Sequence, residues 1–406
     1  MDRQIRVGIT HGDYNGVGYE VIFKALAQDG ASDVITDMLT PVVFGLPAVA
    51  NEALRKFELP NIKLNIVKRA GDAKSGRINV VDISEEPESQ SGNQAVQSGQ
   101  ASKEGENPVQ PGQVSKEAGE SAVKALERAV EALKAGEIDV LVTAPISKEA
   151  VQSQKFNFPG HTEYLTDRLG EGSEAQMILC NDSLRVALLT KHIPISQIAE
   201  NITKEKLVEA VEKFTSTLKK DFGIVKPAVA VLSLNPHAGD GGLLGKEEEE
   251  IIKPALEELL QNGYLAFGPF AADGFFGHGT YKKFDGVLAM YHDQGLAPFK
   301  TLATSGGVNF SAGLPYVRTS PDHGTAFDIA WQNVADAKSM RDAIYMAVDV
   351  FKRRKTFEHS ASNPLKKYVH ERPERGERQD RPDRPEKTDR PEKAERSRKE
   401  NTEEND

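Results

Sequence analysis

This sequence of 406 residues has almost no capacity for disulfide chemistry, because it contains a single cysteine, Cys180. A chain without a disulfide framework fits a reducing compartment, so we expect a cytoplasmic protein. No apolar run approaches the ~20 residues that a membrane-spanning helix needs. Basic residues are also in deficit, since the net charge is −10, whereas a nucleic-acid-binding surface is basic. We therefore expect neither a membrane nor a nucleic acid as a partner.

Two segments lack the apolar residues from which a core is built. Residues 84–115 are rich in Ser, Gln, Gly and Glu, which predicts a flexible insertion at about these positions. Residues 361–406 repeat Arg, Pro, Glu and Asp, and this composition predicts a disordered charged tail. Either segment could bind another protein, so an interaction protein built on an enzyme fold is one hypothesis for the chain.

The rest of the chain alternates short apolar runs with longer amphipathic stretches of helical periodicity. Such alternation is typical of crossover units, so the sequence predicts an α/β fold with a mainly parallel central sheet and helices on both faces. The expected strands are Ile5–Thr10, Pro41–Gly45, Asp139–Ala144, Arg185–Leu189, Ala228–Leu234 and Phe284–Tyr291, and the expected helices are Ala118–Ala135, Lys204–Lys220 and Glu247–Gln261.

Three histidines occupy the same kind of position in this pattern. His192, His237 and His292 each follow a strand-like run and stand beside a turn-forming residue. Ligands of α/β proteins bind at the carboxyl ends of strands, and neutral imidazole is the commonest metal ligand. One histidine at such a place is more often structural, but three indicate a divalent metal site with positions left for substrate. From spacing alone, both interpretations remain open.

Cationic and amide side chains follow the third histidine. Lys300 and Arg318 could neutralise an anionic group, and Asn309 lies between them in the sequence. Each cation could equally be a solvated surface charge. His161 precedes an expected helix, Tyr164–Leu169, so it could contact a ligand or bond to the start of that helix.

A candidate phosphate-binding segment lies at residues 320–330. Asp322 is expected to cap a helix whose first N–H groups, those of Gly324, Thr325 and Ala326, could bind a pyrophosphate. The sequence has no G-x-G-x-x-G fingerprint after a strand and no NTPase phosphate loop. A nicotinamide cofactor would therefore bind outside a Rossmann turn.

Eight motifs together resemble the 4-hydroxythreonine-4-phosphate dehydrogenase family of vitamin B6 (pyridoxal phosphate) biosynthesis. The resemblance extends from Gly8 to about Ala330 and is interrupted by the insertion. In chain order the motifs are ITHGDYNGVGYE, LVTAPISKEA, FPGHTEYL, LLTKHIPI, LNPHAGDGG, MYHDQGLAPFK, GVNFSAGLPYVRTS and DHGTAFDIA.

For the fold, the resemblance implies the architecture of the isocitrate and isopropylmalate dehydrogenases. Two α/β/α domains would enclose an active site in the cleft between them, completed across a homodimer. The first domain would comprise residues 1–140 with 305–360, and the second residues 141–304.

For the site, the resemblance assigns metal binding to His192, His237 and His292, the last of them from the partner subunit. It assigns the substrate to His161, Thr162, Lys300, Asn309 and Arg318, with catalytic roles for His161, Lys300 and Asp273. DHGTAFDIA is similar to a cofactor-binding loop of the wider superfamily, which supports a cofactor site at Gly324, Thr325 and Ala326.

For the reaction, the resemblance implies that NAD or NADP oxidises 4-phosphohydroxy-L-threonine at C3. The product, 2-amino-3-oxo-4-phosphooxybutanoate, would decarboxylate to 3-amino-2-oxopropyl phosphate. Imidazole ligands favour zinc, while magnesium or cobalt remain possible. A sister activity on D-threonate or D-erythronate 4-phosphate is the close alternative, and a metal-dependent phosphoester hydrolase is a more distant one.

The chain departs from the family pattern at several positions. His11, Tyr14 and Tyr19 stand in a first loop where prolines are usual. Gly274 and Ser311 replace a hydroxyl residue and a threonine, and Trp331 replaces a glycine at the end of the expected cofactor loop.

Overall fold

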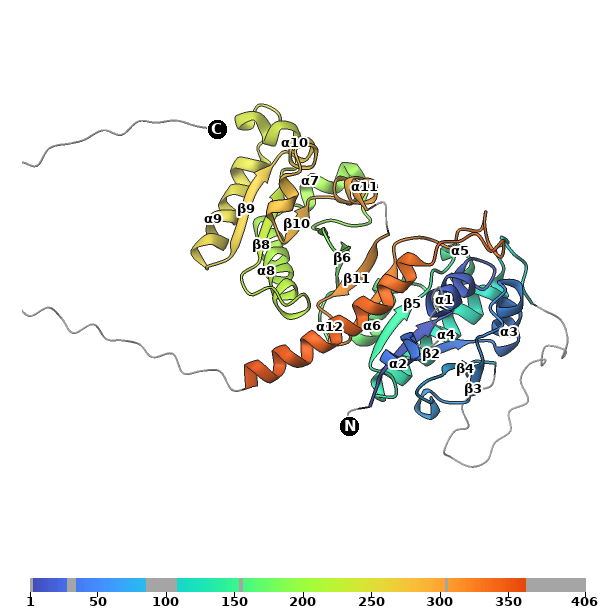
Figure 1. Cartoon of the computed structure of the whole chain (residues 1–406). Helices are drawn as coiled ribbons and strands as arrows, with labels where there is room; N and C mark the ends of the chain where they lie inside the picture. Colours follow the sequence, from blue (N-terminus) through green and yellow to red (C-terminus); the bar gives the residue numbers. More distant parts are fainter. Residues whose placement is uncertain (1–2, 28–33, 85–107, 153–155, 304–305, 363–406) are drawn as a thin grey trace, which may run out of the picture. The chain divides into compact units, whose positions relative to one another are not determined.

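The strands of the chain form one mixed sheet (Figure 1). The computed structural model describes residues 3–27, 34–84, 108–152, 156–303 and 306–362. Residues 85–107 of the predicted insertion and 363–406 of the predicted tail lie outside the described residues. Residues Met1–Ser362 form one compact unit, so the division into two domains at residues 140 and 304 stays a prediction.

Within the described residues the sheet has twelve strands, in the order β3-β4-β2-β1-β5-β12-β11-β6-β7-β10-β8-β9. Most neighbours are parallel, whereas β11 is antiparallel to both β12 and β6, and β6 is antiparallel to β7. The predicted α/β class with a mainly parallel sheet is thereby confirmed. The strands are β1 Ile5–Thr10, β2 Leu39–Gly45, β3 Leu64–Val67, β4 Ile78–Asp82, β5 Val140–Thr143, β6 Gln176–Cys180, β7 Arg185–Leu188, β8 Ala228–Leu232, β9 Leu265–Phe270, β10 Gly286–Ala289, β11 Val308–Ala312 and β12 Arg318–Pro321.

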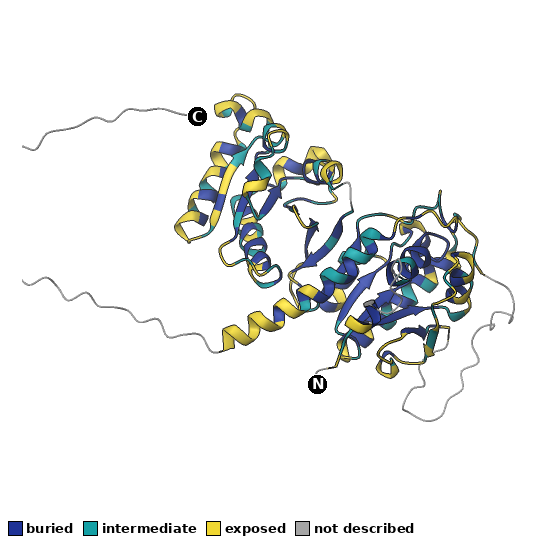
Figure 2. Cartoon of the chain, viewed as in Figure 1, coloured by how far each residue is buried: buried dark blue, intermediate teal, exposed yellow. Residues whose placement is uncertain are grey.

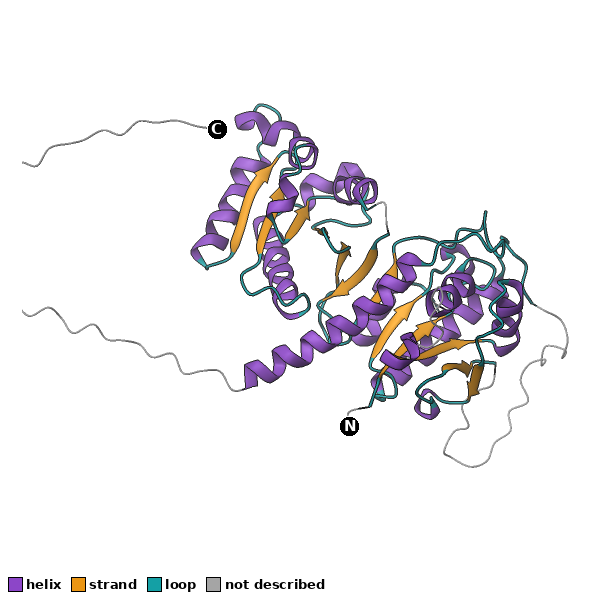
Figure 3. Cartoon of the chain, in the orientation of Figure 1, coloured by secondary structure: helices purple, strands orange, loops and turns teal. Residues whose placement is uncertain are grey.

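Helices cover both faces of the sheet, which explains why its central strands are almost continuously apolar (Figures 2 and 3). One core lies between the first strands and helices α1, α3 and α12, and a second lies between the same strands and α4 with α6. The helices are α1 Gly18–Ala27, α2 Val34–Met38, α3 Pro47–Lys56, α4 Lys116–Lys134, α5 Lys148–Val151, α6 His161–Leu169, α7 Ile198–Asn201, α8 Lys204–Lys220, α9 Lys253–Gln261, α10 Ala272–Gly277, α11 His292–Leu302 and α12 Lys338–Ser362.

Strand β1 shows how alternation divides the two cores. Val7 and Ile9 are fully buried against the core that contains α1 and α12. Between them, Gly8 faces the other core, where a Cβ would lie 2.3 Å from Cδ1 of Ile138. Glycine at this position therefore permits the close packing on the α4 side of the sheet.

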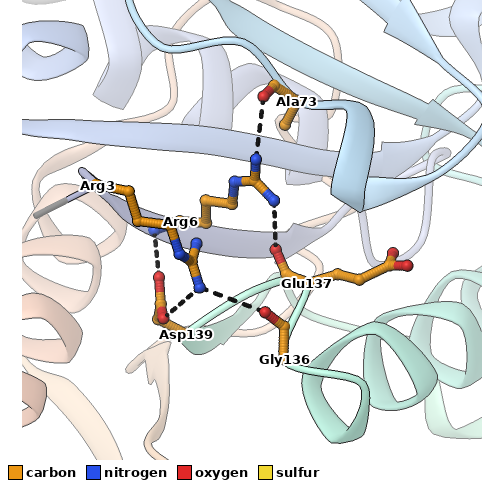
Figure 4. A network of polar contacts seen from close by, with 6 residues as sticks. All are labelled: Arg3, Arg6, Ala73, Gly136, Glu137 and Asp139. Atoms are coloured by element: carbon orange, nitrogen blue, oxygen red, sulfur yellow. Dashed lines mark hydrogen bonds and ion pairs between the residues drawn. The ribbon is translucent and has the colours of Figure 1, made fainter.

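A polar network fixes the amino-terminal ends of β1 and β5 (Figure 4). The carboxylate of Asp139 accepts hydrogen bonds from the backbone N–H of Arg6 and from the guanidinium of Arg3, at 2.8 and 3.0 Å. The guanidinium of Arg6 donates to the carbonyls of Glu137 and Ala73. These bonds set the register in which the two strands reach the opposite, carboxyl edge of the sheet.

The predicted elements are present: β1 has the predicted bounds, β2 begins two residues earlier, and the other predicted strands are shorter. The expected helix Lys204–Lys220 is reproduced without change as α8, while the run Phe284–Tyr291 contains only four strand residues. The expected helix Glu247–Gln261 begins with a wider turn at Glu248–Ile252 before α9.

The end of the predicted insertion is held in place. Asn15 accepts a hydrogen bond from the backbone of Gln110 at 2.7 Å and donates one to the carbonyl of Gln113 at 2.9 Å. Ser115 then caps α4 by accepting from the N–H of Ala118. Residues 108–115 therefore have fixed partners, which the polar composition of this segment did not indicate.

Among the described helices, none is long and apolar enough to cross a membrane.

Candidate active site

A cavity of about 320 Å³ is lined by all five predicted substrate residues. Its volume is typical of a pocket for a small ligand. His161 and Thr162 come from the first turn of α6, Lys300 from α11, Asn309 from β11 and Arg318 from β12. The cavity is also lined by His192, His292 and Gly324.

Arg318 is the most deeply buried cation of this site, with 2% of its surface exposed. Its guanidinium donates to the hydroxyls of Ser311 and Thr143, at 3.0 and 2.7 Å, and Nε has no partner. Burial lowers the pKa of Arg318 to about 10, partly opposed by the charge of Glu163. Among the described residues it forms no ion pair with a carboxylate. A buried guanidinium with neutral partners is an anion-binding group.

Two neighbouring side chains present unused hydrogen-bonding atoms. Nε2 of His161 and Oδ1 of Asn309 are both buried and without a partner. Burial, and then the charge of Arg318, lowers the pKa of His161 well below its usual value. The neutral form of His161 is therefore favoured at physiological pH, and its ring can donate or accept a hydrogen bond.

Lys300 and Asp322 form an ion pair at the wall of the cavity, with 3.2 Å between Nζ and Oδ1. Burial raises the pKa of Asp322, and the ammonium of Lys300 acts against that rise. The side chain of Lys300 is half exposed, so its ammonium has donors left for a ligand.

Each of the three histidines follows a strand, as predicted. His192 follows β7, His292 follows β10 and His237 follows β8, and these strands are neighbours in the sheet. The rings of His192 and His292 lie 5.8 Å apart between centroids. Burial lowers the pKa of His192, which favours the neutral form of its ring.

His237 does not line the cavity with the other two. Among the described residues, no group of three or more His, Cys, Asp or Glu side chains is placed to hold a metal ion. The resemblance implied that His292 comes from the partner subunit, whereas the structure pairs His292 with His192 in one chain. The metal site therefore stays a prediction.

The turn that carries His237 has an unusual backbone. Five consecutive residues, His237–Gly241, have positive φ angles, although only two of them are glycines. Each non-glycine residue in this conformation costs of order 1 kcal/mol, and such strain is concentrated at functional sites. The fully buried carboxylate of Glu248 supports the turn by accepting from the N–H groups of Leu234 and Asn235, both at 2.8 Å.

The expected helix after Asp322 is absent, and this prediction was wrong. The segment continues in turns, with positive φ angles at Ala326, Trp331 and Asn333 that no α-helix contains. The carboxylate of Asp322 is engaged by Lys300 instead of capping a helix. Of the three predicted cofactor residues, only Gly324 lines the cavity.

The loop after β1 contacts the predicted cofactor segment through its backbone. The N–H of Val17 donates to the carbonyl of Thr325 at 3.0 Å. At Gly16 a Cβ would lie 2.7 Å from that same oxygen, so only glycine permits the approach.

Packing and backbone conformation account for the residues that depart from the family pattern in the first loop and at Trp331. The rings of His11 and Tyr19 stack with 5.3 Å between centroids, and the rings of His11 and Tyr14 stack with 6.2 Å between centroids. Trp331 has a φ of 61°, a conformation that favours glycine, which accounts for the glycine usual there. Its indole is buried and packs on Phe57, with ring centroids 5.3 Å apart.

Some residues of the cavity were not predicted from the sequence, and one predicted catalytic residue, Asp273, does not line the cavity. Lys148 and Glu163 line the cavity, and Thr143 binds Arg318. All three lie within the eight motifs, but no feature of the sequence predicted a role for these individual residues. Asp273 does not line the cavity: it is exposed on α10, and its carboxylate accepts from the N–H of Gly274 at 2.7 Å. This bond uses the backbone N–H of Gly274, so it does not need the hydroxyl side chain that is usual at this position.

Known proteins of similar sequence and structure share this fold. The family model of the pyridoxal phosphate biosynthetic protein PdxA matches residues 37–347. A 4-hydroxythreonine-4-phosphate dehydrogenase of Bacteroides thetaiotaomicron is 48% identical over 371 residues, 91% of this chain and 95% of the relative. A D-threonate 4-phosphate dehydrogenase of Salmonella typhimurium is 37% identical over 346 residues, 85% of this chain and 98% of the relative. A solved 4-hydroxythreonine-4-phosphate dehydrogenase from Klebsiella pneumoniae matches with a TM-score of 0.69 and 33% identity, covering 86% of this chain and 98% of that one.

The fold, the pocket and these relatives define an α/β enzyme of the dehydrogenase class. The match of the family model extends over most of the chain and begins after the aromatic first loop. The chain belongs to the family of the pyridoxal phosphate biosynthetic protein PdxA, and the resemblance drawn from the eight motifs is confirmed.

Proposed function

We propose that the chain oxidises 4-phosphohydroxy-L-threonine at C3 with NAD or NADP, and that the resulting β-keto acid decarboxylates to 3-amino-2-oxopropyl phosphate. The observation that carries the proposal is the buried guanidinium of Arg318, which faces only hydroxyl partners in the described chain. A phosphate or carboxylate would offset the cost of burying that charge. The name of the B. thetaiotaomicron relative supports this substrate.

The pocket residues have distinct roles in this proposal. Arg318 and Lys300 bind the phosphate and the carboxylate of the substrate. The unpartnered Oδ1 of Asn309 accepts a hydrogen bond from the amino group at C2, and neutral His161 with Thr162 orients the polar end. Held in this way, the C3–H bond has one fixed direction relative to the cofactor.

We place the nicotinamide beside Gly324, where the backbone has open space and faces the cavity. When bound, the nicotinamide supplies the hydride acceptor for C3. Backbone groups of Thr325 and Ala326 would hold the rest of the cofactor. Binding of NAD by this segment needs no glycine-rich helix start, in keeping with its irregular backbone.

We further propose that His192, His237 and His292 hold a divalent ion, zinc by ligand type, with cobalt or magnesium as alternatives. When bound, the ion supplies a Lewis acid for the C3 alcohol. The donor chemistry fits, because three imidazoles follow three neighbouring strands. One chain brings only two of the rings together, so a second copy would complete the set.

Exposed apolar side chains near these histidines support a homodimer. Ile195, three residues after His192, is 81% exposed, and Leu243, six residues after His237, is 79% exposed. Side chains of this kind are commonly covered in an interface. Light scattering at micromolar concentration should give the mass of two chains.

Mixing inactive variants tests whether the chains share the site. His292→Ala and His237→Ala variants should each be inactive alone. If their ligands come from different chains, mixed dimers contain one intact site and one doubly damaged site, so activity returns. If all ligands come from one chain, mixing restores nothing and the shared site is refuted.

The sister activity rests on the relatives named D-threonate 4-phosphate dehydrogenase. Initial rates of NADH formation with 4-phosphohydroxy-L-threonine and with D-threonate 4-phosphate decide between them, and a higher kcat/KM for the threonate would overturn our choice. The hydrolase alternative predicts phosphate release without NAD, which the same preparation can be assayed for. The single buried Cys180 fits the cytoplasmic location that we propose.

A further inference from the structure

Gln294 fills the gap in which two strands of the sheet separate. The parallel register of β10 with β8 ends at Leu288 and Val231. Beyond it, Oε1 of Gln294 accepts a hydrogen bond from the N–H of Met290 at 2.8 Å, and Nε2 donates to the carbonyl of Ser233 at 2.6 Å. The side-chain amide of Gln294 thus acts like a peptide group: it continues the hydrogen bonding between the β10 and β8 segments beyond the point where their backbones are paired.

Both ends of this bridge lie on segments that lead to histidines. Met290 is two residues before His292, and Ser233 is four residues before His237. Gln294 is 8% exposed and does not line the cavity, so its amide has no direct access to a ligand there.

On the other side of β10, backbone hydrogen bonds to the β7 segment continue to Met290, and one side-chain hydroxyl adds to them. Thr190, two residues before His192, donates its backbone N–H and its hydroxyl to the carbonyl of Met290, at 3.1 and 2.7 Å. Direct bonds therefore fix the β7 segment relative to β10, and the amide of Gln294 alone joins β10 to the start of the His237 segment at this level of the described sheet.

We propose that Gln294 is a positioning residue, whose amide sets the spacing between the segments carrying His292 and His237. This inference rests on the proposed function, in which these histidines serve one site. It applies whether the third ligand comes from the same chain or from a second copy, because the bridge fixes both half-sites of a symmetric dimer.

The bridge requires an amide of this length. One end must accept from an N–H and the other must donate to a carbonyl, so methionine can do neither well, and ionised glutamate repels the carbonyl of Ser233. Protonated glutamic acid can do both. Because Gln294 is buried, its amide stabilises the fold only when both ends are bonded.

The test compares Gln294→Met and Gln294→Glu with a matched control, Gln176→Met. Gln176 is also a buried glutamine, and its Nε2 donates to the carbonyl of Ala210 at 3.2 Å, but it lies on β6. For each full-length variant, Co²⁺ affinity is measured by calorimetry and by the visible spectrum, together with kcat, KM and the thermal midpoint.

We expect Gln294→Met to lower Co²⁺ affinity and kcat by about 10- to 100-fold, the usual effect of losing a group that orients metal ligands. KM for the substrate and the thermal midpoint should stay near those of Gln176→Met. Gln294→Glu should also bind Co²⁺ more weakly than wild type, because an ionised carboxylate cannot donate to the carbonyl of Ser233.

Wild-type Co²⁺ affinity and kcat in Gln294→Met, with Co²⁺ binding that His237→Ala abolishes, would overturn this inference and leave the proposed function intact. A wild-type protein that binds no Co²⁺ would overturn the metal proposal and this inference together. If Gln294→Met fails to fold, Gln294→Asn decides, because its amide is one methylene shorter and cannot reach both partners; wild-type Co²⁺ affinity and kcat in that variant would also overturn this inference.

Discussion

The indole Nε1 of Trp331 donates a hydrogen bond to the carbonyl of Tyr14 at 2.8 Å, across 317 positions of sequence. This bond joins the end of the proposed cofactor segment to the aromatic first loop. The two features that depart most from the family pattern are therefore in contact, which explains why both can occur in the same chain.

Because Trp331 is the only tryptophan of the chain, its fluorescence reports on this segment alone. Titration with NADH should quench the emission and give energy transfer to the nicotinamide. Trp331→Phe keeps an aromatic ring but loses the bond to Tyr14, and should raise KM for NAD about fivefold, equivalent to about 1 kcal/mol.

Phe57→Leu is the control for that variant, since it reduces packing on the same indole from the other side. It should lower the midpoint of unfolding without changing KM for NAD. If Trp331→Phe changes only KM for the phosphorylated substrate, the cofactor assignment of this segment is incorrect.

Two buried arginines should respond oppositely to replacement by methionine. Arg318 faces hydroxyls, so Arg318→Met removes a costly unpaired charge, and we expect unchanged or higher stability with kcat/KM lowered at least ~100-fold. Arg354 forms two bonds with the carboxylate of Asp221, at 2.7 and 3.0 Å, so Arg354→Met should cost about 3 kcal/mol or more in unfolding free energy.

Urea unfolding and initial-rate kinetics on the two variants measure both quantities. The pattern is diagnostic because the side chains are equally large and similarly buried. A large loss of stability in Arg318→Met would mean that its charge is already compensated within the protein.

Stability should fall as the pH is lowered from 6.5 to 4, in part because of His11. Burial lowers the pKa of His11 to about 4, whereas the unfolded chain has the usual value of 6.5. In this window the unfolded state binds a proton that the folded state excludes, so the contribution is complete above 6.5 and is lost toward 4. Its size is about 3 kcal/mol.

His11→Phe keeps the stack with Tyr19 and removes the titrating group. Unfolding free energies at pH 7.5 and pH 5 should therefore differ less in the variant than in wild type. His161, whose pKa is also lowered, leaves a residual slope of the same sign. Equal slopes in the two proteins would contradict the buried neutral state of His11.

Glu248→Gln should loosen the left-handed turn that carries His237. The substitution replaces one acceptor oxygen with an amide nitrogen, so at least one bond to Leu234 or Asn235 is lost, at a cost of about 2 kcal/mol. We expect lower stability and faster limited proteolysis at residues 236–245.

Glu249→Gln is the matched control, because Glu249 is exposed and, within the described parts of the chain, forms its ion pair with Lys253 on the same helical face. Its effect on unfolding free energy should stay below about 0.5 kcal/mol. Equal effects of the two variants would show that Glu248 does not support the turn.

The sequence predicted the site best where a residue able to bind a ligand directly follows an apolar run that forms a strand. The segments with His192 and His292 were predictable, because a buried parallel strand is an apolar run and its carboxyl end is a turn. The middle of the sheet was not predicted, because β11 and β12 are short and contain the polar Asn309 and Arg318.

Other features depend on contacts between distant segments. The N–H of Val17 fixes the backbone at Thr325, so the local preference for a capped helix after Asp322 does not decide the conformation. Gln294 gives no sign of its bridge, since its partners are peptide groups that any sequence contains.

The position of β12 also has a consequence for synthesis of the chain. Its residues 318–321 insert between β5, at residues 140–143, and β11, so the edge of β5 stays open until most of the protein has left the ribosome. Arg318 enters on this last strand, and the pocket therefore forms only when the sheet closes. Ribosome-bound chains shorter than about 320 residues would expose an unpaired edge, which makes them clients for chaperones.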